Sequence, residues 1–341
     1  MRKYQLSVVI ILMLVLTLSL SACGGTGTTT AATVTPGTTT NQPGTGPQGL
    51  PLYCPLAVAV DRQDHLYISD NDNTTVHERI IELSPSGQEL SEWHLFPPDA
   101  LGTTQGPGSL AFDAQGNLYV IDLGRMQVVK VSPEGKILAR WGSAGSGAGQ
   151  FESPQALAVD SQGHVYVSDL GTASIRVEKF SDTGTYLGTV ITLNQAYFIG
   201  LAVDSSDQLY VSTGVSITKF APSGQVLAKA VTLPETDPAA TATWMGLSIS
   251  TRDDFSGIYM TMARTGTATY PRLLSMDLAT GKVLAVLNVW KAGIVAVLSI
   301  ALDSQGNLYA VERTQAGVMQ IQKFSSTGVV LGTWKGTCSG S

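Results

Sequence analysis

The sequence predicts an all-β fold, a six-bladed β-propeller of four-stranded antiparallel blades, and three observations predict it. A motif of the type DAQGNLYVID, residues 113–122, recurs along the chain at spacings of 44 to 53 residues, a period typical of a propeller blade. Each copy divides into four short runs that alternate as strands do. In every copy a turn containing glycine separates the third run from the fourth.

The first run of each copy predicts the innermost strand of its blade. Small residues alternate with large ones in every run. Because strand side chains point to opposite faces in turn, one face is flat and accepts the bulky face of the next blade near the axis. The runs are AVAV, SLAF, ALAV, GLAV, GLSI and SIAL, and they immediately precede the anchor residues Asp61, Asp113, Asp160, Asp204, Ser250 and Asp303.

The repeated motif resembles a paired-carboxylate site, but it is interpreted as architecture. The carboxylate of Asp113 is expected to accept backbone N–H groups within its own turn. Gly116 is expected to take a positive φ, and Asp64 and Asp207 stand in the same position, where aspartate is tolerated. Five strand residues place Asp122 about 15 Å from the turn, so the two carboxylates of one copy cannot chelate one ion.

Two other features of the repeat concern its third strand and its fifth copy. A lysine recurs on the third strand, and it is expected to lie on a solvated outer face; the positions are Lys130, Lys179, Lys219 and Lys323. The fifth copy has Ser250 in place of the anchor aspartate, and DDFSG, residues 253–257, in place of the short turn. It is expected to form the most irregular of the six blades.

Residues 1–22 predict a lipoprotein signal peptide. The basic start MRK precedes the apolar run Leu6–Leu20, which is short for a membrane span. The stretch Leu20-Ser21-Ala22-Cys23 resembles the bacterial lipoprotein lipobox, which implies cleavage before Cys23 and lipidation of its sulfur. The alternative is an ordinary secretory peptide with an incidental cysteine.

The segment that follows predicts a tether rather than a domain. Residues 23–50 are rich in Thr, Gly and Pro and carry no charge, so they are expected to be disordered, with an end-to-end distance of roughly 30 Å. Residues 51–341 then form the propeller. The expected location is the cell envelope, with the lipid anchor on the outer side of the cytoplasmic membrane, or in an outer membrane where one exists.

Two segments resemble a known family. The stretch PQALAVDSQGHVYVSDLGTASIRVEKFSDTG, residues 154–184, is similar to an NHL repeat, and so is the connector WGSAGSGAGQFESP, residues 141–154. The resemblance extends over about residues 54–336. It implies a six-bladed propeller and leaves the function open, because NHL-like propellers include peptide binders, RNA binders, lyases and relatives of hydrolases.

The sequence offers no motif for a catalytic residue, a metal site or a cofactor. His65 and His164 occupy equivalent turn positions in two copies and are interpreted as turn residues. The stretch DNDNTTVHE, residues 70–78, lacks the Gly and Glu spacing of an EF-hand, so a solvated loop is expected there, with a calcium site as the alternative. A net charge of −6 without a basic cluster argues against a nucleic-acid partner.

Long, varied loops on one face predict a binding surface. The expected function is a surface-anchored, monomeric scaffold for an unknown extracellular or envelope ligand, which is a glycan, a peptide or a protein. The alternative is a lactonase-like propeller hydrolase or lyase with its site at the mouth of the central channel, so enzymatic activity stays open. Aromatic loop residues either contact the ligand or cover the blades. The candidate ligand-binding residues are Tyr197, Phe198, Trp244, Tyr270, Asp70 and Asp72.

The two remaining cysteines predict a disulfide that closes the ring. Cys54 precedes the first blade and Cys338 follows the last one. Because the repeats count out as six whole units, little strand exchange is expected where the chain ends meet. A Cys54–Cys338 bond is therefore expected there, in a compartment that permits disulfides. The alternative is two unpaired thiols.

Overall fold

The structure is a computed structural model of the chain, and it describes side chains for residues 52–71, 78–96, 106–172, 174–194, 200–212, 217–228 and 294–338. Within the part of the chain that the structure covers, no helix is both long and apolar enough to span a membrane. The backbone is described for residues 52–71, 78–96, 106–172, 174–194, 200–213, 216–232, 242–243, 257–264, 272–277, 283–287 and 294–338.

The described strands form six four-stranded antiparallel sheets, and within each sheet the strands lie in sequence order. The first three sheets are formed by β1 (Pro55–Val60), β2 (Leu66–Asp70), β3 (Arg79–Leu83) and β4 (Glu89–Trp93); β5 (Pro107–Phe112), β6 (Leu118–Asp122), β7 (Gln127–Val131) and β8 (Ile137–Trp141); and β9 (Pro154–Val159), β10 (Val165–Leu170), β11 (Ile175–Phe180) and β12 (Tyr186–Leu193). The others are formed by β13 (Leu201–Val203), β14 (Leu209–Thr213), β15 (Ser216–Phe220) and β16 (Val226–Thr232); β17 (Ala242–Thr243), β18 (Gly257–Arg264), β19 (Arg272–Asp277) and β20 (Val283–Leu287); and β21 (Ile294–Leu302), β22 (Leu308–Thr314), β23 (Met319–Phe324) and β24 (Val330–Lys335).

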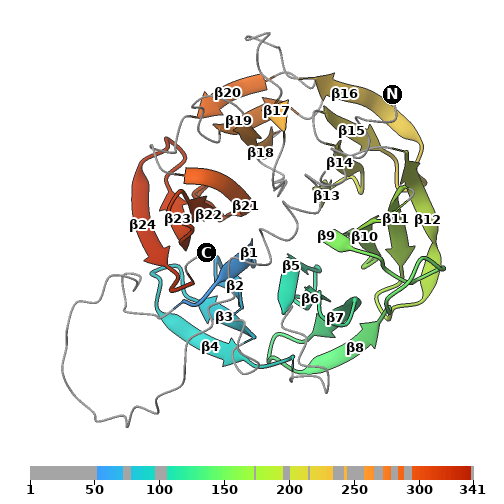
Figure 1. Cartoon of the computed structure of the whole chain (residues 1–341), viewed down its shortest axis with the longest axis horizontal. Helices are drawn as coiled ribbons and strands as arrows, with labels where there is room; N and C mark the ends of the chain where they lie inside the picture. The colour runs from blue at the N-terminus through green and yellow to red at the C-terminus, as the bar shows by residue number, and fades with distance from the viewer. Residues whose placement is uncertain are drawn as a thin grey trace.

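The sheets are arranged as the blades of a propeller, with the first strand of each repeat toward the centre (Figure 1). Strand β1 contacts both β21 and β5, β5 contacts β9, and β9 contacts β13. The alternation of small and large residues in these runs explains the close approach, because neighbouring inner strands can interdigitate. The predicted all-β propeller of four-stranded antiparallel blades, with the first run innermost, is therefore confirmed.

The prediction of six blades is only partly met, since five blades follow the predicted repeat. In the sheet of β17–β20 the inner strand is Ala242–Thr243, which pairs with Arg264 and Ala263. The predicted inner run GLSI, residues 246–249, lies outside the described residues. The physical reason is visible in the sequence, because this copy lacks the anchor aspartate and the short turn that define the register of the first hairpin.

Neighbouring blades are held together by a tryptophan that packs against a turn glycine of the next blade. A Cβ atom built on Gly135 would lie only 2.8 Å from Nε1 of Trp93, and one on Gly184 would lie 2.7 Å from the ring of Trp141. The two glycines have φ values of 78° and 90°. The turn glycines predicted from the repeat are thus needed for two reasons: the backbone has a positive φ, and the indole ring leaves no room for a Cβ atom.

Gly184→Ala is expected to lower the free energy of unfolding by about 1–3 kcal/mol more than Gly163→Ala does. Both positions have a positive φ, which costs about 1–2 kcal/mol for alanine. Only Gly184 is also packed against Trp141, whereas a Cβ on Gly163 would meet Asp182 at an ordinary 3.4 Å. Urea denaturation of the two variants measures the difference. Equal losses would show that the indole contact contributes nothing.

The ends of the propeller chain meet through backbone hydrogen bonds, and not through the predicted disulfide. Leu52 and Gly336 form a parallel bridge. Thr337 N donates to Leu52 O at 3.0 Å, and Cys338 N donates to Tyr53 O at 3.0 Å. Cys338 is a free thiol, so the predicted bond between Cys54 and Cys338 is wrong. The seam does not need it, because the two terminal segments satisfy each other's backbone groups.

Side chains close the same seam in the way that they join other blades. Ser304 donates from its backbone N–H to Asp64 Oδ1 at 2.6 Å, just as Ser161 does to Asp207 at 2.7 Å. The ring of Trp334 lies against Gly87, whose added Cβ would be 3.1 Å away. The expectation of little strand exchange is confirmed, because each sheet consists of consecutive strands, and the contacts at the seam lie outside the sheets.

Candidate functional site

The two ends of the blades carry different polar networks. We call the end at which second strands finish and first strands begin the connector end, and the end with the tight turns between first and second strands the turn end. Asp122 closes β6 at the connector end, and Asp113 lies at the turn end, where its Oδ1 accepts the backbone N–H groups of Gln115 and Asn117 at 2.9 and 2.8 Å. The predicted turn is therefore confirmed, and the two carboxylates serve separate networks.

Asp70 is a buried structural residue rather than an accessible ligand-binding one. Its carboxylate is fully buried and accepts the backbone N–H groups of Tyr53 and Cys54. Arg79, opposite it on β3, pairs with it at 2.9 Å. The prediction of Asp70 as a ligand-binding residue is therefore wrong, because its oxygens are occupied by the chain itself. The other candidates, Asp72, Tyr197, Phe198, Trp244 and Tyr270, lie outside the described residues.

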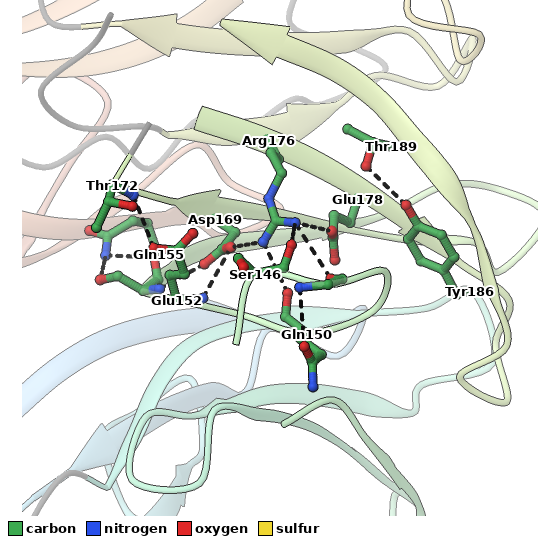
Figure 2. A network of polar contacts seen from close by, with 12 residues as sticks. Ser146, Gln150, Glu152, Gln155, Asp169, Thr172, Arg176, Glu178, Tyr186 and Thr189 are labelled. Atoms are coloured by element: carbon green, nitrogen blue, oxygen red, sulfur yellow. Dashed lines mark hydrogen bonds and ion pairs between the residues drawn. The ribbon is translucent and has the colours of Figure 1, made fainter. Parts of the chain in front are cut away.

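The third blade has the most extensive network at the connector end, and Figure 2 shows it from close by. Asp169 is fully buried and accepts the backbone N–H groups of Glu152 and Ser153 at 3.1 and 2.7 Å. Arg176, its partner on β11, donates from Nη2 to Asp169 at 2.6 Å. This pair repeats the Asp70–Arg79 arrangement and fixes the backbone that enters the inner strand.

Arg176 also holds the connector between the second and third blades. Its guanidinium donates to the carbonyl oxygens of Ser146 at 2.7 Å and of Gln150 at 3.1 Å (Figure 2). The connector forms a parallel bridge between Ala144 and Phe151, and the Phe151 side chain is fully buried. One partly buried arginine therefore gives a glycine-rich loop a defined shape, with Ser146 exposed on it.

Glu178 lies next to Arg176 on the same face of β11 and is the unusual acid of this network. Its side chain is fully buried, and neither carboxylate oxygen has a hydrogen-bond partner. The nearest charge is Arg176 Nη1, at 3.2 Å. Burial raises the pKa of Glu178 to about 7, although the nearby guanidinium opposes the increase. Neither Arg176 nor Glu178 was predicted from the sequence. The available signal for Arg176 was that an arginine faces the second aspartate across the hairpin in copies one and three.

The inner strands use their few polar groups to bond to backbone. Ser109 Oγ accepts the N–H of Leu157 in the next blade at 3.3 Å, and Ser299 Oγ accepts that of Val58 at 3.1 Å. Gln155 donates to the carbonyl oxygen of Ser153 at 3.1 Å. Ser109 and Ser299 therefore connect the inner strands of neighbouring blades.

The recurring lysines belong to the core of the turn end, so the prediction that they form a solvated outer face is wrong. Each lysine lies over the ring of the tyrosine opposite it and points to the anchor aspartate of its blade. The Nζ-to-centroid distances are 5.2, 5.0, 5.1 and 4.8 Å for Lys130 on Tyr119, Lys179 on Tyr166, Lys219 on Tyr210 and Lys323 on Tyr309. The corresponding distances to Oδ2 of Asp113, Asp160, Asp204 and Asp303 are 3.8, 3.9, 3.6 and 3.3 Å. A partly buried ammonium over an aromatic face stabilises the fold, which explains its repetition.

One group of side chains has the composition and spacing to hold a metal ion among the residues that the structure describes. It comprises Asp61, His65 and Glu82 of the first blade, with one ligand atom of each within 4.8 Å of the others. His65 is a turn residue as predicted, since its N–H donates to Asp61 Oδ1 at 2.8 Å. The interpretation of His65 as a turn residue and not a ligand rested on its position in the repeat and did not consider Glu82.

Comparison with solved structures identifies the fold. Virginiamycin B lyase from Staphylococcus aureus is 12% identical, with a TM-score of 0.55, over 82% of this chain and 83% of that one. A protein of unknown function from Bacteroides thetaiotaomicron is 14% identical, with a TM-score of 0.55, over 86% and 72%. One from Bacteroides caccae is 15% identical, with a TM-score of 0.51, over 76% and 89%. At these identities the likeness shows the propeller fold alone. No protein-family model and no curated protein matches the chain.

Proposed function

We propose that this chain is a surface lipoprotein whose β-propeller is a ligand-binding scaffold. In this proposal Cys23 carries the lipid, residues 23–50 are the tether, and the sheet of β17–β20 completes the ring as a sixth, NHL-like blade. The lipobox-like stretch before Cys23 and the repeated motif support these assignments. The ligand is an extracellular or envelope glycan, peptide or protein.

The observation that carries the proposal is the connector held by Arg176. A glycine-rich loop without such a partner would lose conformational entropy when it bound a ligand, and ordering it in advance removes that cost. Asp169 and Arg176 provide this order from within the blade, so the exposed atoms of the loop remain available for contact. A rigid scaffold that presents shaped loops at one end is a common design of recognition proteins.

The enzyme alternative has weaker support in the residues described. One structural neighbour is a lyase, but the likeness extends to the fold and not to a site. The polar side chains of the inner strands, Ser109, Gln155 and Ser299, bond to the chain itself. These contacts favour a scaffold over a reaction centre built on the inner strands.

Binding to glycan and peptide arrays by the purified full-length chain in detergent tests the function. A ligand found there is expected to bind Ser146→Arg at least about tenfold more weakly, because the added side chain stands on the shaped loop. Gln162→Arg is the matched control, since residue 162 is exposed at the turn end. Absence of any ligand, or equal weakening by both substitutions, would contradict the proposal.

Cys23→Ser is expected to release the protein from the membrane fraction. Acyl chains contribute about 0.8 kcal/mol per buried CH₂ group, so two or more chains hold a protein firmly on a membrane. A protein that lacks the acyl chains loses this contribution entirely. Immunoblotting of membrane and soluble fractions measures the change, and Cys338→Ser is the control. Unchanged membrane association of Cys23→Ser would rule out this anchor without affecting the binding proposal.

A further inference from the structure

The turn end of the propeller has a recurring position for a cation. In four blades a lysine ammonium occupies it, between the anchor aspartate and the face of a tyrosine. The lysines differ in their neighbours but agree in their placement, at 3.3 to 3.9 Å from the aspartate Oδ2. This repetition shows that the fold accommodates a positive charge there and pairs it with a carboxylate.

The first blade has the same frame with the lysine replaced by an acid. Tyr67 pairs with Glu82 in the register in which Tyr119 pairs with Lys130. Asp61 is the anchor aspartate, as Asp113 is in the second blade. The substitution removes one positive charge and adds one negative charge at a position where the other blades are neutral. Two carboxylates thus lie close together where four other blades pair one carboxylate with an ammonium.

A histidine completes the group in the first blade. His65 Nδ1 lies 2.9 Å from Glu82 Oε1 and 3.5 Å from Asp61 Oδ2. The other oxygen of each acid is already used, because Asp61 Oδ1 accepts the N–H groups of Gln63 and His65, and Glu82 Oε2 accepts the hydroxyl of Ser91. The hydroxyl of Tyr67 hydrogen-bonds to both carboxylates, as that of Tyr119 does to Asp113. One ligand atom of each member of the group lies within 4.8 Å of the other two, at the position of the missing ammonium.

We propose that Asp61, His65 and Glu82 form a divalent-metal site that accepts Zn²⁺ in place of the lysine ammonium of the other blades. Zinc takes imidazole nitrogen and carboxylate oxygen at about 2.0–2.2 Å, and the edges of such a tetrahedron are about 3.4 Å long. The observed separations of 2.9 and 3.5 Å from His65 Nδ1 lie close to this value, and the third, between the two carboxylates, is no more than 4.8 Å. Ser91 already orients Glu82 from the outer side, as second-shell groups of metal sites do.

The ligands come from three places in the blade, so a bound ion would link them. Asp61 follows the inner strand, His65 lies in the turn, and Glu82 lies on the third strand. The side chains are only partly buried, which leaves a path for the ion and a fourth position for water. The site is separate from the connector end, and the inference does not depend on the proposed ligand.

Zinc retention by the purified full-length chain tests the proposal. After incubation with ZnCl₂ and desalting, the wild-type chain is expected to keep about one zinc per molecule by elemental analysis. Glu82→Lys restores the residue of four other blades, so it is expected to fold and to keep no more than about a tenth as much. His65→Asn restores the residue found at positions 117 and 307, and it is expected to weaken binding at least about tenfold.

Two controls make the outcome decisive. His164→Asn removes the equivalent histidine of the third blade, where Lys179 supplies the cation, and it is expected to retain zinc as the wild type does. Cys338→Ser is expected to do the same, which separates the site from binding by the free thiol. Zinc should raise the Tm of the wild type and not that of Glu82→Lys. No retained zinc in the wild type, or undiminished zinc in Glu82→Lys, would overturn the proposal.

Discussion

Asp169→Ala is expected to lower the free energy of unfolding by about 2–4 kcal/mol, because it leaves the partly buried guanidinium of Arg176 without its closest partner. The substitution also removes the acceptor for the N–H groups of Glu152 and Ser153. Urea denaturation followed by tryptophan fluorescence measures the loss. Trp141 reports on the same blade junction, since its ring packs against Phe180.

Two further variants identify the cause. Asp182→Ala removes an aspartate whose side chain is 54% exposed and which pairs with Lys130 at 3.4 Å, so its cost is expected to stay below about 1 kcal/mol. The double variant Asp169→Ala/Arg176→Met removes both charges and is expected to be more stable than Asp169→Ala alone. A double variant less stable than the single one would contradict the unpaired-charge explanation.

Glu178→Gln is expected to stabilise the protein at pH 8 relative to the wild type, by up to about 3 kcal/mol, and to change little at pH 5. The pKa of Glu178 is raised from an ordinary 4.5 to about 7 by burial, so the folded protein binds a proton more tightly than the unfolded chain. Wild-type stability therefore falls as the pH rises from about 4.5 to 7, and glutamine removes this loss.

Denaturation curves at pH 5, 6, 7 and 8 for the two proteins measure this dependence. Glu89→Gln, at an exposed position on β4, is the control and is expected to keep the wild-type profile. A stability difference between Glu178→Gln and the wild type that does not vary with pH would show that Glu178 is ionised throughout the folded state.

Local features of the repeat were predictable from the sequence because their cause is local. The carboxylate of Asp113 bonds within its own turn, and Asp64 and Asp207 adopt φ values of 63° and 60° in the glycine position, as expected. The alternation of small and large residues likewise identified the inner strands. These features depend on neighbours within a few positions in the chain, which pattern analysis can see.

Contacts across strands and blades were harder to predict. The role of Lys130 depends on a tyrosine on another strand and an aspartate beyond it, and polarity alone suggested exposure. The prediction of Asp70 as a ligand-binding residue followed from the oxygen-rich loop next to it. In the structure its carboxylate pairs with Arg79 and accepts two backbone N–H groups. The joining of the chain ends depends on where a whole ring closes, which no local pattern records.

The bridge between Leu52 and Gly336 makes the first and last blades neighbours in the ring, although they lie at opposite ends of the repeat in the polypeptide. The first and last blades meet through the same kinds of contact as blades that are consecutive in the chain, including a serine–aspartate pair and a tryptophan–glycine contact. The junction is therefore one of several nearly equivalent places at which a circle can be cut. A circular permutation that joined the present ends and opened another junction would preserve the architecture while moving the point from which the proposed lipid tether departs.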